Sequence, residues 1–165
     1  MSDNIIRNIS QCQNALLNEG YFIDFISLPP DILELSVANN FDSLDKRFFE
    51  LTKEGGFLFN YLKQFCPLKE IEFIISLREA QNEWEEDGIW HDDGSRMLAF
   101  SLSLTTTPPI GGVLEFRKKG LEESNKIAPP AYGNIIVFKT GIDQYEHKIN
   151  KVENGRRLII AGWCT

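Results

Sequence analysis

The sequence lacks the long apolar run, the targeting segment and the cysteine pattern that would set it apart from an ordinary globular chain. No apolar stretch approaches the roughly 20 residues that a membrane-spanning helix needs, so we expect no association with a membrane. The first residues include no basic segment followed by an apolar one, which argues against a signal peptide. The three cysteines are odd in number and lack metal-ligand spacing. We therefore interpret Cys12, Cys66 and Cys164 as reduced thiols and expect a cytoplasmic protein.

Positive charge is also scarce. The 165 residues carry 17 Lys and Arg against 24 Asp and Glu, which gives a formal net charge of -7. This balance disfavours a nucleic-acid partner, because binding to phosphates needs clustered Lys and Arg, although a local basic patch stays compatible with one. The length suits one domain with a core of ordinary size, and no feature of the sequence indicates an oligomeric state.

The N-terminal third predicts helices around one early strand. Apolar residues recur at helical spacing in four segments: residues 4–19, a segment that starts at Asp31, residues 42–54 and residues 57–65. Aromatic and β-branched residues are concentrated in residues 21–26, which predicts a strand. We expect residues 1–69 to form a helical support region that includes this strand.

From residue 70 onward the pattern changes to that of β strands. Six short segments rich in apolar and β-branched residues are separated by turns that contain Gly and Pro: residues 70–77, 97–104, 112–117, 134–138, 145–149 and 157–163. With no helix between them, they predict an antiparallel sandwich or barrel. Residues 118–133 form a long polar connection and a candidate active-site loop. The sequence therefore predicts a mainly β fold with N-terminal helices, in a single domain over residues 1–165 whose β core spans residues 70–165.

The chain has only two histidines, and one of them is close to a carboxylate. His91 and Asp93 stand two apart in the segment Trp-His-Asp-Asp-Gly-Ser-Arg, so on an extended chain both side chains leave the same face. His147 lies in another predicted strand. Two histidines and one carboxylate on one face of a metal ion form the triad typical of non-haem Fe(II) oxygenases. A His-x-Asp pair on its own is also compatible with ordinary polar surface, so the triad needs further support.

That support comes from an arginine in the last predicted strand. Arg157 is followed by a run of apolar residues that should be largely buried, whereas strand alternation turns Arg156 to the opposite face. An unpaired buried guanidinium is costly, so Arg157 needs a carboxylate partner, either from a protein side chain or from a ligand.

The ordered set of His91, Asp93, His147 and Arg157 resembles the Fe(II)- and 2-oxoglutarate-dependent oxygenase superfamily, and most closely its prolyl-hydroxylase-like branch. Three further segments agree with the resemblance: residues 111–116, which resemble the family's Gly-Gly-x-Leu strand, residues 133–138 ahead of the second histidine, and Trp163 near the end. The resemblance covers residues 70–165.

The resemblance implies a double-stranded β-helix, also called a jelly roll and shared with cupins, with a metal at one mouth. It implies that His91, Asp93 and His147 bind Fe(II), and that Arg157 forms a bidentate pair with the distal carboxylate of 2-oxoglutarate. The register of the strand after the His-x-Asp segment places Ser103 where some hydroxylases have a tyrosine that contacts this cosubstrate. O2 is the second cosubstrate.

The implied activity is that of a 2-oxoglutarate-dependent dioxygenase that hydroxylates an unactivated C–H bond and releases succinate and CO2. The substrate would be a prolyl residue, a peptide or an amino acid, so the expected partner is a peptide, a protein or a small molecule. Asp93 favours hydroxylation, since halogenating relatives lack this carboxylate.

Two other functions are compatible with parts of the pattern. A nucleic-acid dealkylase of the same superfamily fits poorly, because the chain is acidic and Trp163 stands where a second arginine is expected. A cupin-like metal-binding protein that does not use 2-oxoglutarate would have no need of Arg157, so this residue discriminates between the readings.

Overall fold

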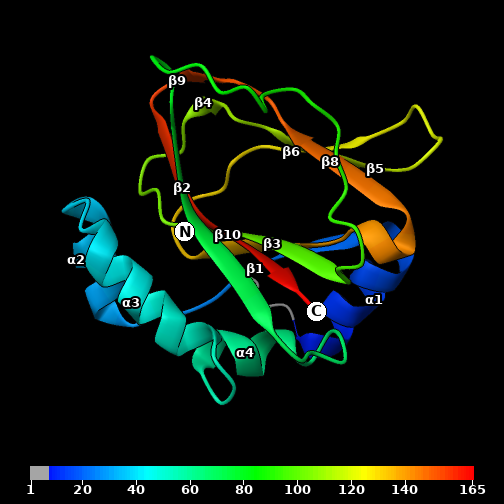
Figure 1. Cartoon of the computed structure of the whole chain (residues 1–165), viewed down its shortest axis with the longest axis horizontal. Coiled ribbons are helices and arrows are strands. Elements are labelled where there is room, and N and C mark those ends of the chain that lie inside the picture. The colour runs from blue at the N-terminus through cyan, green and yellow to red at the C-terminus, as the bar shows by residue number, and fades with distance from the viewer. Residues whose placement is uncertain (1–7) are drawn as a thin grey trace.

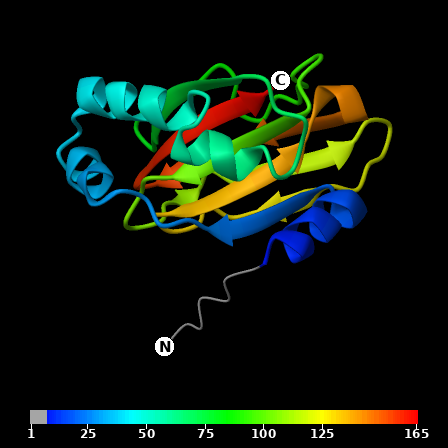
Figure 2. The ribbon, with the colours of Figure 1, turned by 90° about the horizontal axis from the view of Figure 1, so that it is seen from below.

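The chain folds into two β layers with helices on one outer face (Figure 1). The computed structural model describes residues 8–165. The helices lie against one face of a five-stranded sheet, and the shorter strands lie across its other face (Figures 1 and 2). This arrangement confirms the predicted mainly β fold with N-terminal helices.

The helices occupy the N-terminal part of the chain: α1 (Ile9–Glu19), α2 (Pro30–Val37), α3 (Phe41–Thr52) and α4 (Phe57–Leu62). A capping box between Asn8 and Gln11 begins α1, and Gly20 ends it with a φ of 84° that glycine adopts without strain. The helix predicted over residues 4–19 is thus confirmed from Ile9 onward, and the first residues of that prediction lie outside the described part of the chain. No helix within residues 8–165 has the length and apolarity needed to cross a bilayer.

The major sheet consists of five antiparallel strands in the order β1 (Tyr21–Phe25), β7 (Asn134–Lys139), β3 (Leu98–Ser103), β10 (Arg156–Cys164) and β2 (Ile71–Glu79). Its side chains alternate between two cores, as the pleat requires. On β7, Ile135 and Val137 pack with the helices, whereas Ile136 and Phe138 pack with the minor strands. Because both faces are buried, the central strands read as continuous apolar runs.

The minor layer contains a three-stranded sheet in the order β6 (Asn125–Ile127), β5 (Leu114–Lys118) and β8 (Tyr145–Ile149), together with the pair β4 (Ile110–Gly111) and β9 (Val152–Asn154). A short 3-10 helix, η1 (Gly141–Asp143), precedes β8. The sequence did not predict β4, β6 or β9, because two or three residues are too few to show alternation. β6 lies within the connection expected over residues 118–133 and pairs with β5.

Two placements in this fold matter for the site. β10 lies between β3 and β2 in the major sheet, and β8 is an edge strand of the minor sheet. The long segment between β2 and β3 closes against the edge of β8 through a backbone bridge between His91 and His147. One cavity between the layers therefore has walls from both sheets.

Candidate active site

The two histidines meet across the bridge that joins the β2–β3 segment to β8. The backbone N–H of His91 donates to the carbonyl of His147 at 2.9 Å, and the N–H of His147 donates to the carbonyl of His91 at 2.8 Å. The two imidazole centroids are 4.3 Å apart. This pairing brings His91 and His147 side by side, although His91 lies in a loop rather than within a regular strand.

Asp93 completes the cluster. Its carboxylate Oδ2 lies 3.7 Å from His147 Nε2 and accepts a hydrogen bond of 2.8 Å from the hydroxyl of Thr140. One ligand atom from each of His91, Asp93 and His147 can be chosen so that all three lie within 4.8 Å of one another. No other group of three or more His, Cys, Asp or Glu side chains within residues 8–165 has this geometry. Two nitrogens and one oxygen at this separation fit an Fe(II) ion that keeps its opposite face open.

The hydrogen bonding of His91 and the burial of His147 both suit metal binding. His91 Nδ1 lies 3.2 Å from the carbonyl oxygen of Ile89, and only a ring N–H can bond to a carbonyl, so Nε2 is left as the electron-pair donor. Burial lowers the pKa of His147 from 6.5 to about 4, which the nearby carboxylate of Asp93 partly offsets. His147 is therefore neutral at pH 7, as a metal ligand must be.

The segment that carries His91 and Asp93 is anchored to the minor sheet by cations. The guanidinium of Arg117 lies 3.9 Å from the ring centre of Trp90, and the ammonium of Lys148 lies 4.7 Å from it. Asp92 forms an ion pair with Lys119. Together with the His91 bridge, these contacts hold a loop in a fixed position beside β8.

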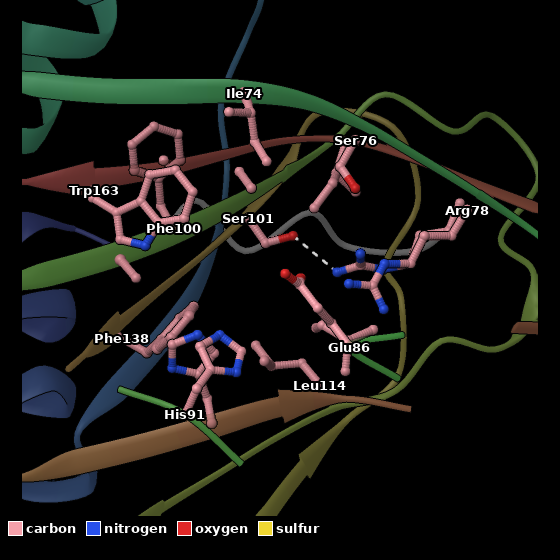
Figure 3. A pocket seen from close by; sticks show the side chains of 17 residues that line it. Ile74, Ser76, Arg78, Glu86, His91, Phe100, Ser101, Leu114, Phe138 and Trp163 are labelled. Carbon is pink, nitrogen blue, oxygen red and sulfur yellow. Dashed lines mark hydrogen bonds between the residues drawn. The ribbon is translucent and has the colours of Figure 1, made fainter. Parts of the chain in front are cut away.

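A cavity extends from the histidines between the two sheets to Arg157 (Figure 3). Only 3% of Arg157 is exposed, and its Nη2 donates to the hydroxyl of Ser101 at 3.3 Å. Its Nε is buried and has no hydrogen-bond partner, and no carboxylate within residues 8–165 forms an ion pair with it. Burial lowers the pKa of Arg157 to about 10, with a smaller contribution from Arg78, so the guanidinium stays charged at neutral pH.

Ser103, which was expected to contact the cosubstrate, is not among the residues that line the cavity. Ser103 is buried outside the cavity, where its hydroxyl accepts a hydrogen bond from the backbone N–H of Thr105 at 3.3 Å. Ser101 lines the cavity instead. The long side chain of Arg157 runs along β10 past the pair Ile159–Ser103 and reaches the level of the next pair on that face, Ala161–Ser101.

Sequence reasoning missed Thr140, Arg78 and Glu86. Arg78 lies in the cavity because β2 continues to Glu79, two residues beyond the predicted end of the strand. An arginine in an apolar strand needs a partner, so Arg78 becomes a candidate on the same ground as Arg157 when the strand is extended to Glu79. Glu86 is exposed, and Figure 3 shows its carboxylate pointing into the cavity.

Comparisons with known proteins agree with this geometry. The profile described as 2OG-Fe(II) oxygenase superfamily matches residues 72–165. A PKHD-type hydroxylase of Prochlorococcus marinus (strain MIT 9301) is 31% identical over 106 residues, which are 62% of this chain and 45% of that protein. The chain spans about half the length of the curated relatives that it matches.

Solved structures share the fold. A prolyl-4-hydroxylase from Pseudomonas putida has a TM-score of 0.61 at 18% identity, with 96% of this chain and 94% of that chain covered. A prolyl hydroxylase from Trichoplax adhaerens, in complex with a hypoxia inducible factor oxygen degradation domain peptide fragment, has a TM-score of 0.60 at 13% identity, with 94% and 88% covered. The two packed sheets are those of a double-stranded β-helix. Since the profile covers more than half of the chain, the protein belongs to the 2OG-Fe(II) oxygenase superfamily, whose members use Fe(II), 2-oxoglutarate and O2.

Proposed function

We propose that the protein is an Fe(II)- and 2-oxoglutarate-dependent dioxygenase that hydroxylates an unactivated C–H bond. One observation carries the proposal: Arg157 is buried, charged and without a carboxylate partner among residues 8–165, in the same cavity that holds His91 and His147. A cupin-like metal protein would have no use for such an arginine. The carboxylate that it needs is the distal one of 2-oxoglutarate.

Each polar side chain has a defined role in this proposal. His91, Asp93 and His147 hold Fe(II), and Thr140 fixes the carboxylate of Asp93 by its 2.8 Å hydrogen bond. Arg157 and the hydroxyl of Ser101 bind and orient the cosubstrate, as a planar guanidinium can do with a carboxylate. The bound Fe(II), together with 2-oxoglutarate and O2, supplies the oxidising chemistry.

The cavity walls keep water away from Arg157, of which only 3% is exposed. Apolar side chains from both sheets line it, among them Leu114, Phe138 and Ile159. Water exclusion strengthens the charge interactions of Arg157, because the effective dielectric constant falls. The same lining would limit the access of water to the oxidising chemistry that bound Fe(II) and its cosubstrates would supply.

For the substrate we propose a prolyl residue, a peptide or an amino acid. The relative from Prochlorococcus is a PKHD-type hydroxylase by name, and two proteins with the same fold are prolyl hydroxylases, one of them bound to a peptide. His91 is exposed, so the metal site opens toward the surface and a segment of another chain can approach it. A nucleic-acid substrate is disfavoured by the net charge of -7.

The test is anaerobic addition of Fe(II) and 2-oxoglutarate, followed by the visible charge-transfer band of the chelated metal. We expect a band in the wild type, none in His91→Ala and a weaker one at equal cosubstrate concentration in Arg157→Ala. Arg156→Ala is the matched control, because its side chain bonds Asn39 on the outside of the fold. Folded, iron-loaded wild type without the band would overturn the proposal. Succinate release with a panel of prolyl peptides and free amino acids then tests the substrate class.

A further inference from the structure

Arg157 has a second guanidinium as its neighbour. Arg78 on β2 is the register partner of Arg157 on β10, so both side chains leave the major sheet on the same face. Both line the cavity, and Figure 3 labels Arg78 at its wall. Only 8% of Arg78 is exposed, so this is a buried charge rather than a solvated one.

Both arginines have an unsatisfied hydrogen-bond donor. Within residues 8–165, four buried side-chain polar atoms have no partner, and two of these are Arg78 Nε and Arg157 Nε. A buried donor without an acceptor destabilises the fold, and more so when it belongs to a charged group. Two such donors on adjacent guanidiniums in one cavity point to an anion that accepts from both.

The charges lead to the same conclusion. Nη1 of Arg78 forms an ion pair of 2.5 Å with Asp87, whereas no carboxylate in the described part of the chain, residues 8–165, pairs with Arg157. Within residues 8–165 Asp87 is the carboxylate that is ion-paired with these two guanidiniums, so one positive charge has no direct partner; the exposed carboxylate of Glu86 also lines the cavity but forms no ion pair with either arginine. Arg78 helps to lower the pKa of Arg157, which is the expected effect of a like charge close by. A single carboxylate would neutralise the group.

We propose that Arg78 is a second cosubstrate-binding arginine, which donates through Nε to the distal carboxylate of 2-oxoglutarate that Arg157 also binds. The inference rests on the proposed function and adds a specificity-determining residue to it. Arg78 makes the cavity select a 2-oxo acid with a distal carboxylate over one that ends in a methyl group. Asp87 and the ring of Trp84, 5.6 Å from the guanidinium, hold Arg78 in place from the β2–β3 segment.

The competing explanation is that Arg78 only fastens this segment through Asp87. The two roles differ in what they recognise. If Arg78 only holds the segment in place, its substitution should change the Kd of every ligand by the same factor, and Asp87→Asn should have the same effect. A carboxylate-binding arginine acts only on ligands that carry the distal carboxylate, and removal of Asp87 would leave it free to bind them.

The test is calorimetric titration of Mn(II)-loaded protein, without turnover, with 2-oxoglutarate and with 2-oxopentanoate, which has a methyl group in place of the distal carboxylate. We expect Arg78→Gln to raise the Kd for 2-oxoglutarate by about 10- to 100-fold, as for a hydrogen bond between charged groups, and to change that for 2-oxopentanoate by less than about twofold. Asp87→Asn should not weaken 2-oxoglutarate binding. Arg78→Lys, which keeps the charge, covers the case in which Arg78→Gln fails to fold and should give an intermediate Kd.

The outcomes distinguish a failure of the proposed function from a failure of the role assigned to Arg78. Wild type that binds no 2-oxoglutarate would overturn the proposed function, and this inference with it. Wild type that binds it, with Arg78→Gln and Arg78→Lys unchanged or weakened equally for both ligands, would overturn only the role of Arg78. Equal losses in Asp87→Asn and Arg78→Gln would assign Arg78 to fastening the segment.

Discussion

His91 and His147 exchange both of their backbone hydrogen bonds, at 2.9 and 2.8 Å, between the β2–β3 segment and β8. The bridge fixes the spacing of the two imidazoles although His91 lies in a loop. Because these bonds use the main chain, they survive a change of side chain. The geometry of the metal site can therefore be tested by substitutions that leave the backbone in place.

His91→Ala should abolish stoichiometric Mn(II) binding and leave the fold intact, since the side chain of His91 is exposed and its backbone bridge remains. Equilibrium dialysis followed by metal analysis measures the stoichiometry, and thermal unfolding checks the fold. Asp92→Asn is the control, because its carboxylate faces Lys119 and the N–H of Gly94 rather than the metal site. Equal metal binding in wild type and His91→Ala would rule out the triad.

Thr140→Val should weaken Mn(II) binding by about tenfold, because Asp93 loses the hydrogen bond that orients its carboxylate. Valine has nearly the volume of threonine, so this buried position stays filled. Thr140→Ser, which retains the hydroxyl, should restore most of the affinity. A Thr140→Val protein with wild-type metal affinity would show that Asp93 is held by its backbone alone.

The lowered pKa of His147 predicts a pH dependence of stability in the metal-free protein. The pKa is about 4 in the folded state against 6.5 for the free side chain, so between these values the unfolded state binds more protons. Stability should rise with pH through this window, and His147 should account for up to about 3 kcal/mol lost as the pH falls from 6.5 to 4. Urea unfolding at a series of pH values, for wild type and His147→Gln, isolates this contribution. Parallel curves for the two proteins would contradict it.

The sequence was most informative where the residues of the site lie within one short stretch of chain. The spacing of His91 and Asp93, and Arg157 in an apolar strand, could be read from short stretches of chain. Thr140 lies 47 residues from Asp93 in sequence, and no local pattern links the two. The choice between Ser101 and Ser103 depends on how far the side chain of Arg157 reaches along β10, which only packing decides. Arg78 was missed because a strand end was placed two residues early.

Glu86→Gln should tighten the binding of 2-oxoglutarate. Figure 3 shows the carboxylate of Glu86 pointing into the cavity, and it makes no hydrogen bond or ion pair with any residue in the range 8–165. The cosubstrate is a dianion, so this unpaired negative charge opposes its entry. Removal of the charge should lower the Kd by about two- to fivefold at low ionic strength, the scale of one partly screened charge interaction.

The neighbouring residue provides a matched control for this prediction. Glu85→Gln makes the same change in net charge at an exposed position that does not line the cavity, so its effect on the Kd should be smaller. The difference between the two variants should shrink as salt is added, since salt screens exposed charges. Calorimetry of the Mn(II)-loaded proteins at two ionic strengths measures both effects. Weaker binding in Glu86→Gln would instead mean that Glu86 supports the arginines when the cosubstrate is bound.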